Sequence, residues 1–176
     1  MIRLTLREKG RLLESDLAFR AQLVIPEQQH LYDYWREQAR GKTMPSRDEI
    51  HPGGFVRLLP TVSLIDVERE PKRYRVRLAG TGLREVYQRE MTGIYLDEAH
   101  WGKNRDYWLA ACYRIVNRKR PAQGIVRTPA RGKEHLVQFW LRLPLSSDGR
   151  QVDMILCYDS FISTQKAVVL SQMAMA

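Results

Sequence analysis

The feature that most constrains the fold is a pair of long apolar stretches, residues 134–145 and 151–162. The dipeptide Asp148-Gly149 lies between them, and this dipeptide between alternating apolar stretches is a strong signal for a β-hairpin. Both stretches carry apolar residues at odd and at even positions. An antiparallel hairpin with one wet face would not have this pattern, so we expect covering layers on both sides of the sheet.

The rest of the chain supplies three more strands and the helices between them. Strands are predicted at residues 62–68, 74–79 and 124–128, and the second of these alternates apolar residues with arginine. Between the second and third strands, helices are predicted at 83–89 and 104–117. The longer one has an apolar stripe at Trp108, Ala111, Cys112 and Ile115. The order predicts an α+β fold with a five-stranded antiparallel sheet.

A helix is also predicted before the sheet. Pro26 suits a first helical turn, and Gly41 suits the end of a helix. Leu31, Tyr34 and Trp35 fall on one face of it. We therefore expect an N-terminal helical extension over residues 1–44, the sheet domain over 45–163 and a short tail over 164–176.

Composition limits the class of protein. With 176 residues and 44% apolar residues, the chain suits one globular domain with flanking segments. Its net charge is +9, and basic residues are densest at Arg114, Arg118, Lys119, Arg120, Arg127, Arg131 and Lys133. Most such residues form solvated faces, but the stretch also fits an anion or nucleic-acid footprint, so a basic nucleic-acid-binding protein is the alternative function.

Two cysteines, Cys112 and Cys157, imply no disulfide framework and fit a reducing cytosol. The first residues alternate charge with leucine and lack the apolar core of a signal peptide, and no stretch reaches the ~20 apolar residues of a membrane span. These features predict a cytoplasmic protein.

Short motifs in order resemble a bacterial PAS-like family whose members often consist of this one domain. The motifs are YW at 34–35, MPSR at 44–47, LLP at 58–60, LIDV at 64–67, YRVRLAGT at 74–81, MTG at 91–93 and LDE at 96–98. Gln88 departs from the family pattern, which has a glycine there. The resemblance implies a PAS fold, with two strands, helices and then three strands, and a sensory or adaptor role in bacterial signal transduction. It names no ligand.

In this fold the helices cover one sheet face, and side chains pointing to it could line a pocket for a small apolar ligand. Alternation along the strands and the helical stripes selects the candidates, which would otherwise simply fill the core. They are Val76, Leu78, Val86, Tyr87, Trp108, Cys112, Ile115, Val137, Phe139, Leu141, Ile155 and Cys157.

The opposite face is also apolar and needs a cover, since a large bare patch is unusual in a monomer. The coverings left open are the N-terminal helix, residues 1–25 and a second copy of the chain in a homodimer. The candidate contact residues, which an unknown signalling partner could also use, are Leu31, Tyr34, Trp35, Leu136, Trp140, Met154, Leu156 and Tyr158.

The sequence contains no pattern typical of a catalytic site or a metal site. The four histidines have no ligand spacing, there is no Cys-x-x-Cys motif, and no nucleophile elbow or phosphate loop is present. We therefore expect no metal site and no enzyme. Haem is not expected, because the helix at 104–117 offers only Cys112 as a ligand. A LOV-type flavin is not expected either, because no Asn-Cys-Arg-like motif occurs at 83–98.

Overall fold

The computed structural model describes residues 6–99, 101, 104–128 and 132–173, with only the backbone for 6–13, 171 and 173. The helices are α1 (Leu6–Ala21), α2 (Pro26–Ala39), α3 (Thr81–Tyr87), α4 (Arg105–Arg118) and α5 (Thr164–Met173). Two 3₁₀ segments are η1 (Arg47–Glu49) and η2 (Pro52–Thr61). The strands are β1 (Val62–Arg69), β2 (Lys72–Ala79), β3 (Ala122–Arg127), β4 (Leu136–Leu145) and β5 (Met154–Ser163).

The five strands form one sheet in the order β2-β1-β5-β4-β3, and every neighbouring pair is antiparallel. Two of the three interior strands, β5 and β4, are those of the predicted Asp-Gly hairpin, with Leu141 opposite Tyr158 and Leu143 opposite Leu156. The α+β fold with helices between the second and third strands is confirmed.

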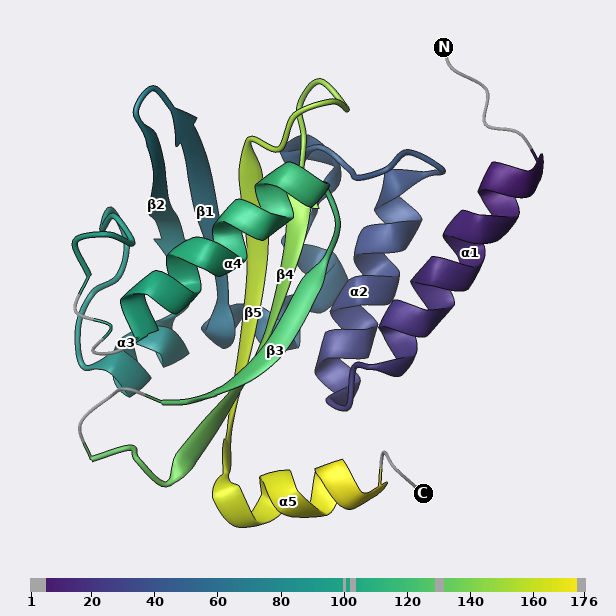
Figure 1. The fold of residues 1–176 in the computed structure, drawn as a ribbon. Coiled ribbons are helices and arrows are strands. Elements are labelled where there is room, and N and C mark those ends of the chain that lie inside the picture. Colours follow the sequence, from purple (N-terminus) through teal and green to yellow (C-terminus); the bar gives the residue numbers. More distant parts are fainter. Residues whose placement is uncertain (1–5, 100, 102–103, 129–131, 174–176) are drawn as a thin grey trace.

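Helices cover both faces of the sheet, as Figure 1 shows. Helix α4 crosses one face, which we call the inner face, and buries the predicted stripe of Trp108, Ala111, Cys112 and Ile115. Helix α2 packs against the other, outer face and buries Leu31 and Trp35 completely.

The N-terminal helices are fixed to the sheet and to each other. The indole N–H of Trp35 donates to the carbonyl oxygen of Pro144 in β4 at 2.9 Å. Helix α1 packs on α2 through two ion pairs, Arg20 with Asp33 at 2.7 Å and Arg36 with Asp16 at 2.6 Å. Because α2 shares the main core with the sheet, both faces of the central strands are dry.

The C-terminal helix α5 lies below the sheet in Figure 1 and covers the remaining end of the outer face. Its Ala167 packs with Ile25 and Phe139 in a second, smaller apolar cluster. Among the described residues no helix is long and apolar enough to cross a membrane.

Candidate functional site

A small cavity of about 40 Å³ lies between the inner face of the sheet and the helices α3 and α4. About 10–15 Å³ is enough for one water molecule, so the space accepts only a few water-sized groups in this conformation. Its lining comes from four strands, both helices and the segment between them: Ser63, Ile65, Val76, Ala79, Leu83, Tyr87, Met91, Leu96, Trp101, Trp108, Cys112, Gln138, Arg142 and Asp159.

A chain of buried polar side chains runs along one wall of this cavity. Tyr87 donates its hydroxyl to Gln138 Oε1 at 2.9 Å, and Gln138 Nε2 donates to Asp159 Oδ1 at 2.8 Å. The same carboxylate oxygen accepts from Arg142 Nη2 at 2.9 Å. The network joins α3 to β4 and β5, and burial raises the pKa of Tyr87, so this hydroxyl stays protonated.

Arg142 is the most constrained member of the network. Its Nη1 donates to the backbone carbonyls of Leu141 and Tyr158 at 3.0 and 3.1 Å, and its side chain is only 7% exposed. Burial alone would lower the pKa of Arg142, but the nearby charge of Asp159 more than offsets this and the pKa is raised. The site therefore holds a fixed cation.

Tryptophan rings surround this cation. The Arg142 guanidinium carbon lies 5.1 Å from the ring centre of Trp108 and 5.6 Å from that of Trp140. Trp140 can lie flat over β3 because the opposing residue is Gly124, where a Cβ atom would come within 2.6 Å of the indole. A larger residue at position 124 would displace this wall of the site.

One donor beside the cavity is unused. The indole N–H of Trp108 is buried and has no hydrogen-bond partner among the described residues, whereas Trp140 donates to the Tyr107 hydroxyl at 3.0 Å. Buried polar groups without a partner are rare, and an unfilled one beside a cavity can donate to a guest.

The two cysteines are inert in this setting. Cys112 and Cys157 are buried free thiols, and burial raises the pKa of Cys112 to about 12 and that of Cys157 to about 11. Both stay protonated near neutral pH, so neither is suited to act as a thiolate nucleophile or ligand. Among the described residues no three His, Cys, Asp or Glu side chains gather as potential metal ligands.

The structure brings together part of the predicted ligand set. Val76, Tyr87, Trp108 and Cys112 line the cavity. Ile115, Ile155 and Cys157 are buried in the core around it, and Val86 is half-buried on α3 outside the lining.

Three predicted ligand residues on β4 lie on the wrong face. Phe139 and Val137 pack in the cluster with α5, and Leu141 pairs with Tyr158 on the outer face. The prediction placed Leu136 and Trp140 of β4 outside and the residues alternating with them inside, which put Gln138 and Arg142 outside as well. The structure reverses this, because Gln138 and Arg142 are satisfied by the buried network and the apolar set is needed under α2 and α5.

Leu78 is also misplaced, for a different reason. Leu64 pairs with Leu78 but Ile65 pairs with Val76, so Arg77 is an extra residue and β2 contains a bulge. A bulge breaks the strict alternation of a strand, and it turns Leu78 to the outer face although Val76 points inward. Leu78 is 49% exposed.

The predicted partner residues are mostly core residues of this chain. Leu31, Trp35, Met154, Leu156 and Tyr158 are buried in the main core, where α2 and the η2 segment after it cover the outer face. Trp140 and half-buried Leu136 lie on the inner face instead. Tyr34 is half-buried, and its hydroxyl donates to the His51 carbonyl at 3.1 Å. These residues therefore form no open partner surface.

Sequence reasoning missed Gln138, Arg142 and Asp159 as site residues. A signal was available, since each is a polar residue within an otherwise apolar strand that is predicted to be dry on both faces. Such residues must find partners inside the protein.

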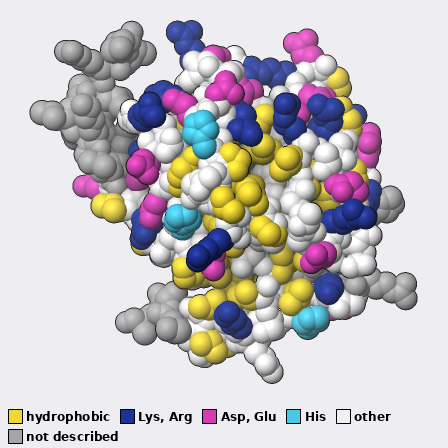
Figure 2. All heavy atoms as spheres, turned by 180° about the vertical axis from the view of Figure 1, so that it is seen from behind, with side chains coloured by type: hydrophobic (Ala, Val, Ile, Leu, Met, Phe, Trp, Pro, Cys, Tyr) yellow, Lys and Arg dark blue, Asp and Glu magenta, His cyan; other side chains and the backbone are white. Residues whose placement is uncertain are grey.

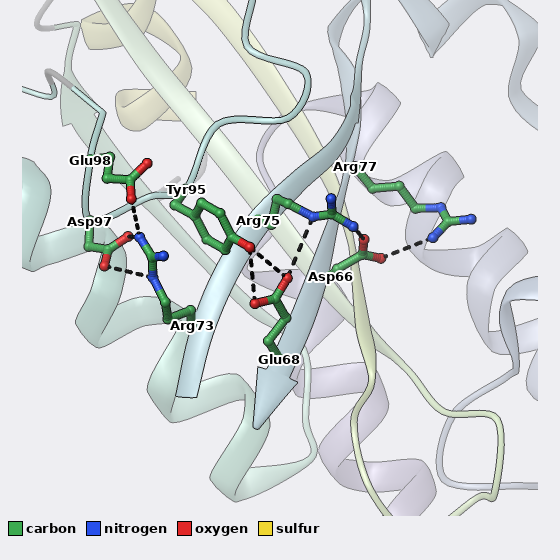
Figure 3. Close-up of polar contacts among 8 residues, drawn as sticks. All are labelled: Asp66, Glu68, Arg73, Arg75, Arg77, Tyr95, Asp97 and Glu98. Carbon is green, nitrogen blue, oxygen red and sulfur yellow. Dashed lines mark hydrogen bonds and ion pairs between the residues drawn. The ribbon is translucent and has the colours of Figure 1, made fainter. Parts of the chain in front are cut away.

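Opposite charges follow the outer face of β1 and β2 (Figure 3). Arg73 pairs with Asp97 at 2.9 Å and Glu98 at 2.5 Å. Asp66 pairs with Arg75 at 3.2 Å and with Arg77 at 3.5 Å. Tyr95 donates to Glu68 at 3.0 Å, which holds its loop against the β2 edge. We call these residues the ion-pair ladder. Their charges are largely neutralised by one another, so little net charge remains there to attract a charged partner.

An apolar groove of about 550 Å³ lies next to the ladder, between η2 and the end of β2. Figure 2 shows this face, with hydrophobic side chains gathered near its centre and charged ones around them. Val56 is 58% exposed and Leu78 49% exposed beside it, and Arg47 lines its wall. Exposed apolar patches often mark interaction sites.

The described residues of the dense basic stretch are divided between the end of α4, the turn after it and the β3–β4 region. Arg114, Arg118, Lys119 and Arg120 are exposed at the end of α4, and Arg127 lies on β3. Arg131 lies outside the described residues.

Several solved structures are similar to this chain. A domain described as that of a light and redox sensing histidine kinase from Haloarcula marismortui matches with 10% identity, covering 61% of this chain and 95% of that chain, with a TM-score of 0.44. The RsLOV d2 variant matches with 13% identity, 74% and 68% coverage and a TM-score of 0.46. A sensory box histidine kinase/response regulator from Burkholderia thailandensis E264 matches with 12% identity, 71% and 98% coverage and a TM-score of 0.43.

No curated protein matches the chain. The family assignment rests on the sequence-family model described as the PAS domain, which matches residues 24–158 and so covers most of the chain, from the start of α2 to β5. This span includes the groove, and also the cavity lining and the buried network apart from Asp159, which is the next residue; the chain belongs to the PAS domain family.

Proposed function

We propose that this chain is a PAS-type sensory module of bacterial signal transduction that takes a small, partly polar ligand in its core cavity and signals through protein contacts. The observation that carries the proposal is the buried Arg142–Asp159 pair beside a cavity with an unused Trp108 donor. The sequence alone pointed to an apolar guest. The polar wall favours a guest with at least one hydrogen-bond acceptor.

The cost of the buried charges supports a binding role. A core that only had to be filled would be served by apolar residues, because replacing a buried ion pair with well-packed apolar residues is often neutral or stabilising. Here the pair borders empty space and is linked by Gln138 to Tyr87 on α3. A guest that bonds to this wall would therefore act on α3 and on the central strands together. No group in it serves as a nucleophile in this proposal, and the role is non-catalytic.

The output contact is assigned to the apolar groove. Its proposed occupant is an amphipathic helix of a partner protein, with apolar side chains flanked by acidic ones. Arg47 lines the groove, and Arg77, next to Leu78, is 58% exposed and only 3.5 Å from Asp66. Arg77 is paired with Asp66, whereas Arg47 forms no ion pair with any described carboxylate and so complements an acidic flank. The apolar groove accepts the helix face.

Ligand retention is tested by native and denaturing mass spectrometry of the purified chain. We expect a native mass above the sequence mass that is lost on denaturation. A second readout is the melting temperature with the low-molecular-weight fraction of the expression cells, which a bound ligand raises. Ala79→Phe fills the cavity and should abolish both effects, whereas Ala110→Phe, at an exposed position of α4, should not. A bare native mass together with an unchanged melting temperature would overturn the ligand proposal.

The output contact is tested with two versions of one amphipathic helical peptide, flanked by glutamate or by lysine. Fluorescence polarisation should detect binding of the glutamate version, and Leu78→Glu should abolish it without changing the melting temperature. The matched control is Val168→Glu on α5, also exposed but far from the groove in sequence. Equal binding of both peptides, or loss with both variants, would argue against the groove.

A further inference from the structure

A second cavity, separate from the core site, lies between the N-terminal helices and the end of α4. It measures about 350 Å³ and is lined by α1, α2 and the two turns that follow α2 and α4. Figure 1 shows the C-terminal end of α4 directed toward α2. Small-molecule sites usually have volumes of about 300–1,000 Å³, so this cavity is large enough for a metabolite.

Four cationic side chains from three segments line this cavity. Arg36 comes from α2, Lys42 from the turn after it, and Lys119 and Arg120 from the turn after α4. The one carboxylate in the lining is that of Asp16. Part of the dense basic stretch of the sequence therefore meets two other basic residues at a hollow of the surface.

Two of these cations are already paired and two are not. Arg36 Nη2 lies 2.6 Å from Asp16, and Lys42 Nζ lies 2.7 Å from Glu49. Lys119 and Arg120 are exposed, and neither forms an ion pair with any described carboxylate. The cavity therefore carries a surplus of positive charge that an anion can neutralise.

Helix capping explains only part of this arrangement. A basic residue after the end of α4 interacts favourably with the helix dipole, and the Lys119 backbone N–H caps the helix by donating to Ile115 at 2.8 Å. That function needs neither Arg120 nor convergence with Lys42 and Arg36. The floor of the cavity adds apolar rings, with Phe19 and Tyr32 5.1 Å apart between ring centres.

We propose that this cavity binds a small phosphorylated molecule, with its phosphate groups on the unpaired Lys119 and Arg120 and its apolar or aromatic part toward Phe19. Phosphate groups are recognised by lysine and arginine through charge-assisted hydrogen bonds. The site is distinct from the core cavity, so the chain has a second input besides the proposed core ligand.

The test measures binding of three probes, pyrophosphate, adenosine 5′-diphosphate and adenosine, by isothermal calorimetry at about 0.15 M salt, where the Debye length is about 8 Å. We expect pyrophosphate to bind, the diphosphate to bind more tightly and adenosine not to bind. The double variant Lys119→Ala/Arg120→Ala should weaken diphosphate binding by about tenfold or more, since hydrogen bonds to charged groups are strong.

The matched control is Arg114→Ala/Arg118→Ala, which removes the same charge from the last turn of α4, next to the tested pair but outside the cavity lining. It should change the dissociation constant by less than about twofold, because the exposed charges it removes are largely screened. All four residues are exposed, so both variants should keep the wild-type melting temperature. Equal weakening by the two double variants, or no binding of either phosphate probe to the wild type, overturns the proposal. Tighter binding of a single-stranded RNA, lost equally in both variants, would instead identify a nucleic-acid surface and also overturn it.

Discussion

Arginine–carboxylate pairs lie on both faces of the same sheet, but their surroundings differ. On the inner face, Arg142 and Asp159 are 7% and 3% exposed and border a cavity. On the outer face, the ladder pairs are open to solvent, with Arg77 58% exposed beside Asp66. The chemical groups are the same, and the distances are similar, at 2.9 Å for Arg142–Asp159 and for Arg73–Asp97.

The difference lies in what happens when a partner is lost. An exposed ion that loses its partner is solvated by water, whereas a buried one remains unpaired in a medium of low dielectric constant. Loss of either member of the inner pair therefore leaves the other one buried without its ion-pair partner. The pair is held in place by Gln138 and two backbone carbonyls. In the outer ladder several residues have two partners, and the arginines are 26–58% exposed, so an ion that loses one partner keeps another contact or water. Only the inner pair has the strict geometry that a ligand could alter.

The largest expected effect is that of Asp159→Ala. Removing this carboxylate leaves Arg142 buried and unpaired, which should lower the free energy of unfolding by about 3–5 kcal/mol. The double variant Asp159→Leu/Arg142→Met removes both charges and should recover much of this loss. Urea unfolding followed by circular dichroism measures both. A loss below about 1 kcal/mol for the single variant would mean that the two faces do not differ.

A much smaller effect is expected for Arg77→Gln on the ladder. Exposed ion pairs contribute about 0–1 kcal/mol, and added salt should shrink even this difference. Urea unfolding at low and high salt is the measurement. If Arg77→Gln were as costly as Asp159→Ala, exposure would not be the property that separates the two groups of pairs.

The elements and their order along the chain could be predicted because their signals are local. Turn residues, apolar stripes and proline positions indicated the strands and α4. The hairpin with apolar residues on both faces correctly predicted covering layers on both sides of the sheet. Which face of β4 pointed inward could not be predicted in this way. When both faces are apolar, alternation tells which residues share a face but not which layer that face meets.

The two errors in the site have separate physical causes. On β4, polar Gln138 and Arg142 were assigned to the outside, but tertiary partners on β5 and α3 satisfy them inside. On β2, a bulge at Arg77 turns the side chain of Leu78 to the other face, and no residue type in the strand predicts this bulge.

The resemblance also contained a useful departure at Gln88. This residue ends α3 in the left-handed region, with φ of 53°, the conformation for which glycine is favoured. The helix therefore ends where the family pattern places its glycine, although a glutamine occupies the position.

The smallest expected effect, the pH dependence of Asp97 in the ladder, tests the same comparison without removing Arg73. Hydrogen bonds from the Arg73 guanidinium, with burial opposing them, hold the pKa of Asp97 below its ordinary value of 3.8. A depressed folded-state pKa stabilises the protein above the unfolded-state pKa, and that stability is lost as the pH falls through the folded-state value. The difference in unfolding free energy between wild type and Asp97→Asn should therefore be constant near neutral pH and shrink as the pH falls below about 4. Urea unfolding across this range measures it, and an Arg73→Gln background should remove most of the pH dependence. A difference that stays constant down to acid pH would mean that Arg73 does not act on Asp97 in solution, and the ladder would then be weaker than its distances indicate.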